Sequence, residues 1–361
     1  MQPACSFPRE RAGESNLVPG RRLGNLRETP AGRLLTGYAS ASIVNREIAI
    51  RKCDFGLRIA SAVAVSSAAS SSPDRRYRTN VATGSSPTVR RRELGFLLRK
   101  LRTDLGLSVD EVTTRLLFSA TKISRLETGR AGASPRDIRD LCDLYGVTPA
   151  ERERLMALAR EGKQRAWWQE YALPYATYIG LEVEAVSISD YNSDVITGMM
   201  QVEPYARAVI EAAEPPLDRA AIEQRMEARL TRQALLTQAG GPAFHFILDE
   251  GALHRHVGGA AVMRSQLERI AEVASFPKVT FQLIPVTLGA HPAMDSTFVI
   301  LEFNEPMVND VVYVEGLVGN IYLEGAADLQ RYRQVFARLR SIASSPEDSV
   351  ALVASIASTY R

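Results

Sequence analysis

Apolar residues recur every three or four positions through residues 88–160, and this spacing predicts short amphipathic helices. The first helix carries leucines at 94, 97, 98 and 101 and ends near Gly106. Further helices are predicted to begin at residues that cap helix N-termini, namely Ser108, Ser119, Ser134 and Thr148. Five short helices in one segment predict a compact all-α domain over residues 88–160.

The stretch from Leu107 to Arg130 has the pattern of two helices joined by a tight turn. Its apolar positions, Val109, Val112, Leu116, Ile123 and Leu126, are spaced to face inward. Thr121, Lys122 and Arg125 share the outer side of the second helix, because positions i, i+1 and i+4 are neighbours on a helix surface. The pattern therefore predicts a helix-turn-helix whose second helix fits the major groove of DNA.

Beyond Arg160 the pattern mixes short apolar runs with helical periods. Strands are predicted over 243–248, 279–284, 297–303 and 311–315, and helices over 217–238, 261–275, 326–342 and 346–358. A helix is also expected to follow Asp249. Strands mixed with helices predict an α/β or α+β domain over residues 165–360.

Residues 1–87 show no sustained period and are rich in Ser, Ala, Arg, Gly and Pro, so we expect a disordered basic extension. Two interpretations stay open: a basic arm that adds nonspecific DNA affinity, or a dispensable leader. The most apolar piece, Leu57–Ala69, is too short to span a bilayer, which needs about 20 residues. We expect no membrane partner.

Cysteine and charge narrow the class of protein. The three cysteines stand far apart in the sequence and form no CxxC motif, so neither a disulfide framework nor structural zinc is predicted. Such sparse cysteine use favours the reducing cytoplasm. No other metal or cofactor is expected. Residues 1–89 carry a net charge of +7, residues 90–160 of +5 and residues 161–361 of −9. Only the basic part is therefore expected to face phosphate.

Two resemblances follow from particular motifs. Lys122-Ile-Ser-Arg-Leu-Glu-Thr-Gly-Arg130 resembles the λ-repressor-like (Xre-type) helix-turn-helix regulators. Thr113 stands where that family usually has alanine. Leu117 stands at the turn position usually held by glycine, which costs on the order of 1 kcal/mol if φ is positive there.

The second region is similar to the C-terminal domain of actinobacterial WhiJ-like, antitoxin-like regulators. The similarity lies in Trp167-Trp168, Tyr205-Ala-Arg207, Leu248-Asp-Glu250, Gly289-Ala-His-Pro292 and Val312-Tyr-Val-Glu315. It implies a DNA-binding regulator whose second domain senses a ligand or a small partner protein.

The predicted DNA-binding residues are Ser119, Thr121, Lys122, Ser124, Arg125, Arg91 and Arg130. Arg125 is expected to read a base, since arginine pairs bidentately with guanine. Ser119, Ser124 and Arg91 are expected to contact phosphate. Glu127, an acid near the end of the reading helix, is expected to form an ion pair within the domain.

In the second domain, Asp249, Glu250, His291 and Glu315 are expected either to border a sensing pocket or partner surface, or to be purely structural. No nucleophile–base pair, phosphate loop or metal-ligand spacing accompanies them, so we expect no enzyme activity. His254 and His256 are two residues apart and diverge on a helix, which favours surface roles. Trp167 and Trp168 are expected to pack between the domains.

The sequence thus predicts a cytoplasmic transcriptional regulator that binds double-stranded DNA. A homodimer is expected, because one short helix reads too few base pairs, with half-sites about 34 Å apart or a multiple of that. The first alternative is an antitoxin-like protein that neutralises a small partner protein encoded nearby. A second alternative, an enzyme acting on a small molecule, requires a pocket where the carboxylates and His291 converge.

Overall fold

The computed structural model describes residues 86–171, 173–213, 215–304 and 308–360. The prediction made for residues 1–87 falls outside these ranges except at Ser86 and Pro87, which begin the first described helix. No helix in the described ranges is long and apolar enough to cross a bilayer.

The helix-turn-helix domain consists of α2 (Pro87–Asp104), α3 (Val109–Leu116), α4 (Ala120–Glu127), α5 (Pro135–Tyr145) and α6 (Pro149–Glu161). The predicted starts of α3 to α6 are confirmed, because each cap side chain accepts a hydrogen bond from the backbone N–H three residues later. These caps satisfy N–H groups that have no partner inside the helix. The boundaries of these helices are therefore set locally.

The core of this domain is built from the inward residues of each helix. Val112, Ile123 and Ile138 are at most 1% exposed. Glu127 forms the ion pair expected of it: Arg102 Nε and one terminal nitrogen lie 2.6 and 2.8 Å from its two carboxylate oxygens. Arg102 also donates to the Leu107 carbonyl, which ties α2 to the start of α3 and the end of α4.

The second domain is built on a mixed sheet of six strands in the order β3-β2-β1-β4-β5-β6. The strands are β1 (Ser187–Asn192), β2 (Ala243–Asp249), β3 (Val279–Ile284), β4 (Phe298–Glu302), β5 (Val311–Val314) and β6 (Ile321–Leu323). β1, β2 and β3 are parallel, whereas β4 pairs antiparallel with β1 and the remaining pairs are antiparallel. The direction of pairing therefore changes at β1.

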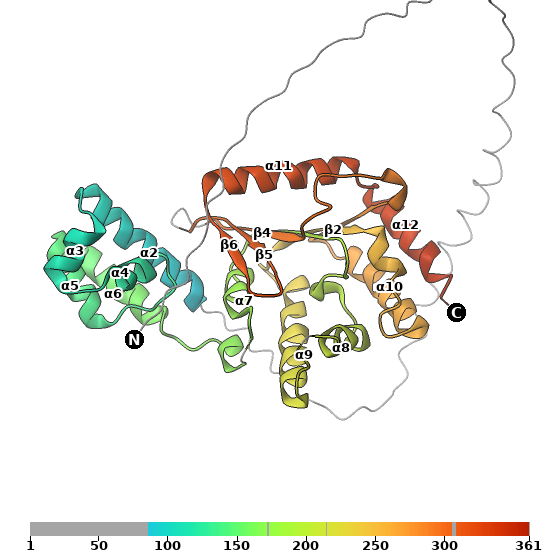
Figure 1. Ribbon diagram of the computed structural model, residues 1–361, viewed down its shortest axis with the longest axis horizontal. Coiled ribbons are helices and arrows are strands. Elements are labelled where there is room, and N and C mark those ends of the chain that lie inside the picture. Colours follow the sequence, from blue (N-terminus) through green and yellow to red (C-terminus); the bar gives the residue numbers. More distant parts are fainter. Residues whose placement is uncertain (1–85, 172, 214, 305–307, 361) are drawn as a thin grey trace, which may run out of the picture. The chain divides into compact units, whose positions relative to one another are not determined.

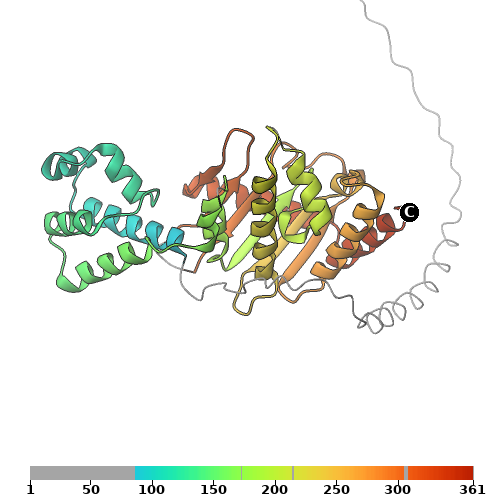
Figure 2. The same cartoon turned by 90° about the horizontal axis from the view of Figure 1, so that it is seen from below.

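Helices cover both faces of the sheet (Figures 1 and 2). One face carries α7 (Ala176–Glu182), α8 (Glu203–Glu211), α9 (Arg219–Gln233), α10 (Ala260–Ala274) and α12 (Pro346–Ala357), and the other carries α11 (Ala326–Ile342). Side chains alternate between the faces along each strand. On β2, Phe244 and Phe246 join the core under the larger helix layer, while Ile247 joins the core under α11.

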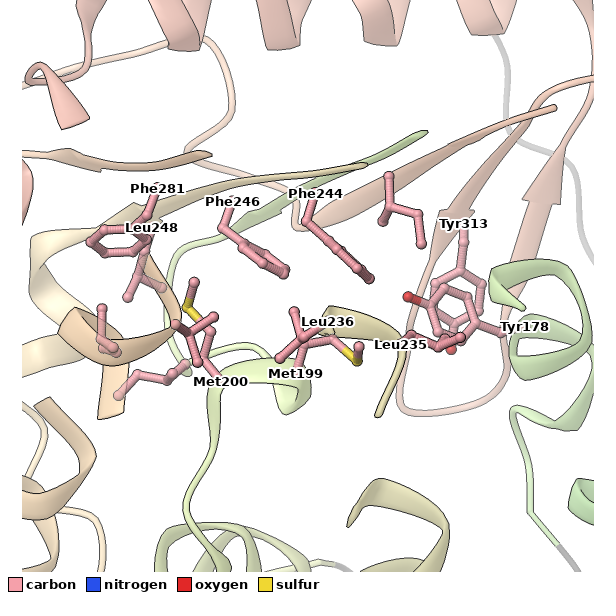
Figure 3. Close-up of a cluster of buried hydrophobic side chains, with 14 of the residues drawn as sticks. Tyr178, Met199, Met200, Leu235, Leu236, Phe244, Phe246, Leu248, Phe281 and Tyr313 are labelled. Atoms are coloured by element: carbon pink, nitrogen blue, oxygen red, sulfur yellow. The ribbon is translucent and has the colours of Figure 1, made fainter. Parts of the chain in front are cut away.

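The larger core is aromatic at its centre (Figure 3). The rings of Phe244 and Phe246 are stacked with centroids 5.3 Å apart. Figure 3 shows them facing Met199 and Leu236 from the segments that precede α8 and follow α9. Because these are large buried side chains, they supply much of the hydrophobic stabilisation of the domain.

The start of α2 is joined to α7. The Ser86 hydroxyl donates to the Gly180 carbonyl at 2.6 Å, and the Ser86 N–H donates to Glu184 at the same distance. A Cβ at Gly180 would lie 2.3 Å from the Thr88 hydroxyl, so the approach requires glycine there. Val89 belongs to the core of the sheet domain, together with the buried Trp168.

Several sequence expectations were wrong in detail. The helix expected after Asp249 is a short 3-10 helix, η4 (Glu250–His254), which ends where Arg255 is extended. The helix expected over 217–238 is α9 followed by a 3-10 turn at Ala234–Leu236. Strands β1 and β6 and helix α7 were not predicted.

Candidate functional site

The outer face of α4 is polar and accessible. Thr121, Ser124 and Arg125 are exposed, while Ile123 and Leu126 on the opposite side are 1% and 4% exposed. Helix α2 packs directly against the buried side of α4, since a Cβ at Gly95 would lie 2.5 Å from the Leu126 carbonyl oxygen. The direction of α4 is therefore fixed by close backbone contact, and its polar side chains are held outward.

Ser119 and Lys122 are partly committed within the protein. The Ser119 hydroxyl accepts from the Lys122 N–H at 3.1 Å as the cap of α4. Lys122 Nζ lies 2.6 Å from Asp137 of α5 and 3.6 Å above the ring of Phe118. A DNA phosphate would have to compete with Asp137 for this ammonium group, so Lys122 is less available than Arg125.

The two remaining predicted arginines differ in their surroundings. Arg130 is exposed just after α4. Arg91 is partly buried, and a Cβ at Gly162 would lie 2.8 Å from its Cγ. Burial lowers the pKa of Arg91, and one of its terminal nitrogens lies 3.4 Å from the Thr88 hydroxyl. Arg91 therefore offers fewer accessible donors to a phosphate than Arg130.

Leu117 occupies the turn between α3 and α4 in a strained conformation. Its φ and ψ are 55° and 37°, and its side chain is 91% exposed. A Cβ is costly in this left-handed region, and the exposed leucine gains almost no burial in return. The turn thus keeps the geometry that glycine usually supplies.

Replacing Leu117 by glycine is expected to stabilise the helix-turn-helix by about 0.5–1 kcal/mol, since the relief of strain exceeds the extra chain entropy of glycine. Hydrogen exchange of the α3 and α4 amides in the intact chain measures this free energy. The control is Leu105→Gly, a half-exposed site with φ of −85°, where the same change should destabilise. Equal destabilisation by both changes would contradict the inference that the backbone of Leu117 is strained.

Three of the four candidate residues in the second domain come together where β2 and β3 end. His291 Nε2 lies 3.4 Å from Asp249 Oδ2. Glu250 accepts from the Val286 N–H at 2.8 Å and lies 3.3 Å from His254. Asp249 and Glu250 therefore hold the loop that follows β3 against the end of β2.

Glu315 does not join this group, which corrects the sequence-based grouping. It follows β5, and two strands, β1 and β4, separate β5 from β2 in the sheet. Glu315 is exposed, so it does not border the site formed by Asp249 and His291.

His291 is almost fully enclosed, with 4% of its side chain exposed. Its Nδ1 accepts from the Ala293 N–H at 3.4 Å, so in the neutral ring the proton is assigned to Nε2, which faces Asp249. The ring of Tyr191 lies edge-on to the imidazole with centroids 5.9 Å apart. A backbone N–H thus occupies Nδ1, and Nε2 lies near the Asp249 carboxylate.

A buried ion pair that sequence reasoning missed lies on the opposite face of the sheet. Two nitrogens of Arg232 each lie 2.7 Å from a carboxylate oxygen of Glu182, which is fully buried. The Tyr178 hydroxyl donates to the same carboxylate at 3.0 Å, and the guanidinium lies 5.1 Å from the Tyr178 ring centroid. Fifty residues separate the charged partners, so no local pattern could reveal the pair.

Asp190, on the central strand β1, is a second buried carboxylate in this region. It accepts hydrogen bonds from the Thr197 hydroxyl at 2.6 Å and the Asn192 amide at 2.5 Å. Burial raises the pKa of Asp190 to about 6, although the bond from Thr197 opposes the shift. The ionised form therefore costs stability in the folded domain.

Asp190 is expected to make the sheet domain less stable as the pH rises from about 4 to 6. A raised folded pKa means that the folded state binds this proton more tightly, so stability is highest below the ordinary aspartate pKa and is lost through pH 6. Asp190→Asn should flatten this slope, measured by urea unfolding followed by the fluorescence of Trp167 and Trp168. Asp194→Asn, at an exposed acid, is the control. An unchanged slope in Asp190→Asn would refute the assignment.

Comparison with known families covers both domains. A family model described as a helix-turn-helix domain matches residues 93–155. A model described as a domain of unknown function, DUF5753, matches residues 175–355, which is half of the chain. No curated protein and no solved structure is similar enough to match the chain.

Proposed function

Because this chain belongs to the family of the domain of unknown function DUF5753 and also carries a helix-turn-helix domain, we propose that it is a sequence-specific transcriptional regulator with a C-terminal sensing domain. The observation that carries the proposal is the polar face of α4, which is exposed while its other side is locked onto α2. We also propose that the regulator is of the Xre type, is WhiJ-like and acts in the cytoplasm.

In the proposed complex α4 lies in the major groove. Arg125 pairs with a guanine, and Thr121 lies one turn before it on the same face. Ser119 and Ser124 bind phosphate, and Arg130, in the loop after α4, contacts the phosphate backbone of the DNA. Lys122 contributes by exchanging Asp137 for a phosphate oxygen.

The proposed active form is a homodimer. Since α4 has eight residues, one copy contacts only a few base pairs. Two copies would read half-sites about 34 Å apart, or a multiple of that. Sedimentation of the complex with a selected duplex gives the number of copies bound.

Selection of bound fragments from genomic DNA tests the main proposal. The intact chain should enrich a sequence with two related half-sites. The control is the variant with alanine at both 121 and 125, which keeps the core of the domain and should enrich none. Failure of the unaltered chain to enrich any sequence would refute sequence-specific binding.

We propose that the second domain binds a ligand and does not catalyse a reaction on it. His291 is the candidate general base, but the Ala293 N–H already donates to its Nδ1 and only 4% of its side chain is exposed. A general base needs a nitrogen within hydrogen-bond reach of the substrate proton. This arrangement favours a structural role for the imidazole.

A second candidate function, antitoxin-like binding of a small protein encoded nearby, is favoured by one observation. Leu317 and Val318, in the turn between β5 and β6, are completely exposed, and Ile321 is half exposed. Apolar residues grouped on a surface mark sites of protein association. Co-expression with the product of a neighbouring gene should then give a stoichiometric complex that Leu317→Asp disrupts. A complex insensitive to this change would exclude the hairpin as the contact.

A further inference from the structure

A pocket of about 300 Å³ lies between α11 and the loop that follows β3. It is lined by Leu288, Ala290, His291, Pro292, Arg338 and Ile342. Four of these residues come from the loop and two from the last turns of α11. The volume is at the lower end of the range of small-molecule sites, roughly 300–1,000 Å³, so the pocket suits a small ligand.

The position of the pocket agrees with the general rule for ligands of α/β sheets. The loop leaves the carboxyl end of β3, and His291 contacts Asp249 at the carboxyl end of the parallel strand β2. Open α/β sheets bind ligands in the crevice outside the carboxyl ends of their strands.

Arg338 is the one lining side chain that always carries a charge. Within the described part of the chain its guanidinium forms no ion pair or hydrogen bond, and the side chain is exposed. No acidic residue among those described lines the pocket, and Asp249, which lies behind it, faces His291. The guanidinium is therefore available for an anion brought by a ligand.

Most of the other lining residues are apolar. Leu288, Pro292 and Ile342 present aliphatic surface, and the Nδ1 of His291 is occupied by the Ala293 N–H. Val286 and Met294 on the same loop are 56% and 65% exposed. Exposed apolar residues beside a pocket favour a ligand that covers them.

We propose that this pocket binds a small carboxylic acid with an apolar body, and that this acid is the signal of the sensing domain. The carboxylate pairs with the planar fork of Arg338, and the apolar body lies on Leu288, Pro292 and Ile342. One arginine matches one negative charge, which suits a carboxylate better than a doubly charged phosphate. The inference rests on the proposed sensing function and names its ligand class.

Calorimetric titration of the intact chain with octanoate tests the site without DNA. Octanoate should bind, whereas octanol, which has the same chain and no charge, and inorganic phosphate should not. Arg338→Ala should weaken octanoate binding about tenfold or more, since it removes a charge-assisted pair. Arg338→Lys should recover only part of the affinity, because it keeps the charge and loses the fork.

The matched control is Arg340→Ala, which removes an exposed arginine of the same helix that does not line the pocket. It should bind octanoate as the unaltered chain does. Absence of octanoate binding, or equal affinity in Arg338→Ala and Arg340→Ala, would overturn the proposal. Leu288→Asp should also abolish binding, and unaltered binding there would exclude this pocket.

DNA binding is then measured with and without octanoate. A change in affinity that Arg338→Ala removes supports both the pocket and its sensing role. Binding of octanoate with no change in DNA affinity leaves the pocket established and refutes the sensing role. Sequence-specific DNA binding in a chain that does not bind octanoate refutes the pocket alone.

Discussion

Arg125→Ala is expected to raise the Kd for the selected operator by roughly tenfold to a hundredfold while leaving the Kd for random duplex nearly unchanged. Arg125 is exposed on the outer face of α4, and a bidentate arginine–guanine pair contributes about 1–3 kcal/mol of discrimination. The loss should therefore appear as lost preference between sequences. Fluorescence anisotropy with both duplexes at one fixed salt concentration measures it.

Arg99→Ala is the matched control, because Arg99 is an exposed arginine of α2 and does not lie on the α4 face. It should leave the ratio of the two affinities unchanged. Arg130→Ala should weaken both duplexes alike and reduce the salt dependence, as expected of a phosphate contact. Equal losses on operator and random duplex for Arg125→Ala would refute base reading by this residue.

Arg232→Met is expected to destabilise the sheet domain by about 3–5 kcal/mol. The change leaves the fully buried Glu182 carboxylate with only the Tyr178 hydroxyl of its present partners, and an unpaired buried charge carries a large desolvation cost. Urea unfolding followed by tryptophan fluorescence should show the lower midpoint, since Trp168 lies in the same core.

The double variant Glu182→Leu with Arg232→Met should recover most of this stability, because it removes both charges together. Arg225→Met, on the same helix and without a buried partner among the described residues, is the control and should change little. If Arg232→Met behaved like Arg225→Met, the ion pair would not contribute as the geometry indicates.

The helix-turn-helix was predictable because its signals are local. The caps Ser108, Ser119 and Thr148 act on N–H groups three residues away, so the sequence window that shows them is the one that uses them. Leu117 was predictable for the same reason, since the turn requires a positive φ whatever residue occupies it. What sequence alone missed here was the partner of Lys122, because Asp137 belongs to another helix.

The sheet domain was less predictable because its central strand does not look like one. β1 reads Ser-Ile-Ser-Asp-Tyr-Asn, and polar residues of this kind are depleted in strands. It is accommodated because Thr197 and Asn192 satisfy Asp190, and those contacts depend on the folded chain. β6 escaped prediction because it has only three residues.

Among the candidate sensing residues, too, some could be identified from the sequence and others could not. Asp249 and Glu250 were identified because they end a clearly apolar strand, and adjacent parallel strands bring the loop carrying His291 to the same edge. Glu315 was grouped with them because it is also an acid in one of the motifs of the WhiJ-like resemblance, which says nothing of where β5 lies in the sheet. Arg338 was not singled out, since an exposed helical arginine has no distinguishing pattern until the loop opposite it is placed.

Helix α2 contributes to two hydrophobic cores, with Val89 in that of the sheet domain and Leu94 and Leu98 in that of the helix-turn-helix. Most of the stability of a helix in a protein comes from its tertiary packing, so loss of either core removes part of the packing that holds α2. The two domains are therefore expected to melt as one cooperative unit rather than in two separate steps. Calorimetry should show a single heat-capacity peak, and Gly180→Val, which forces α2 away from α7, should divide it into two.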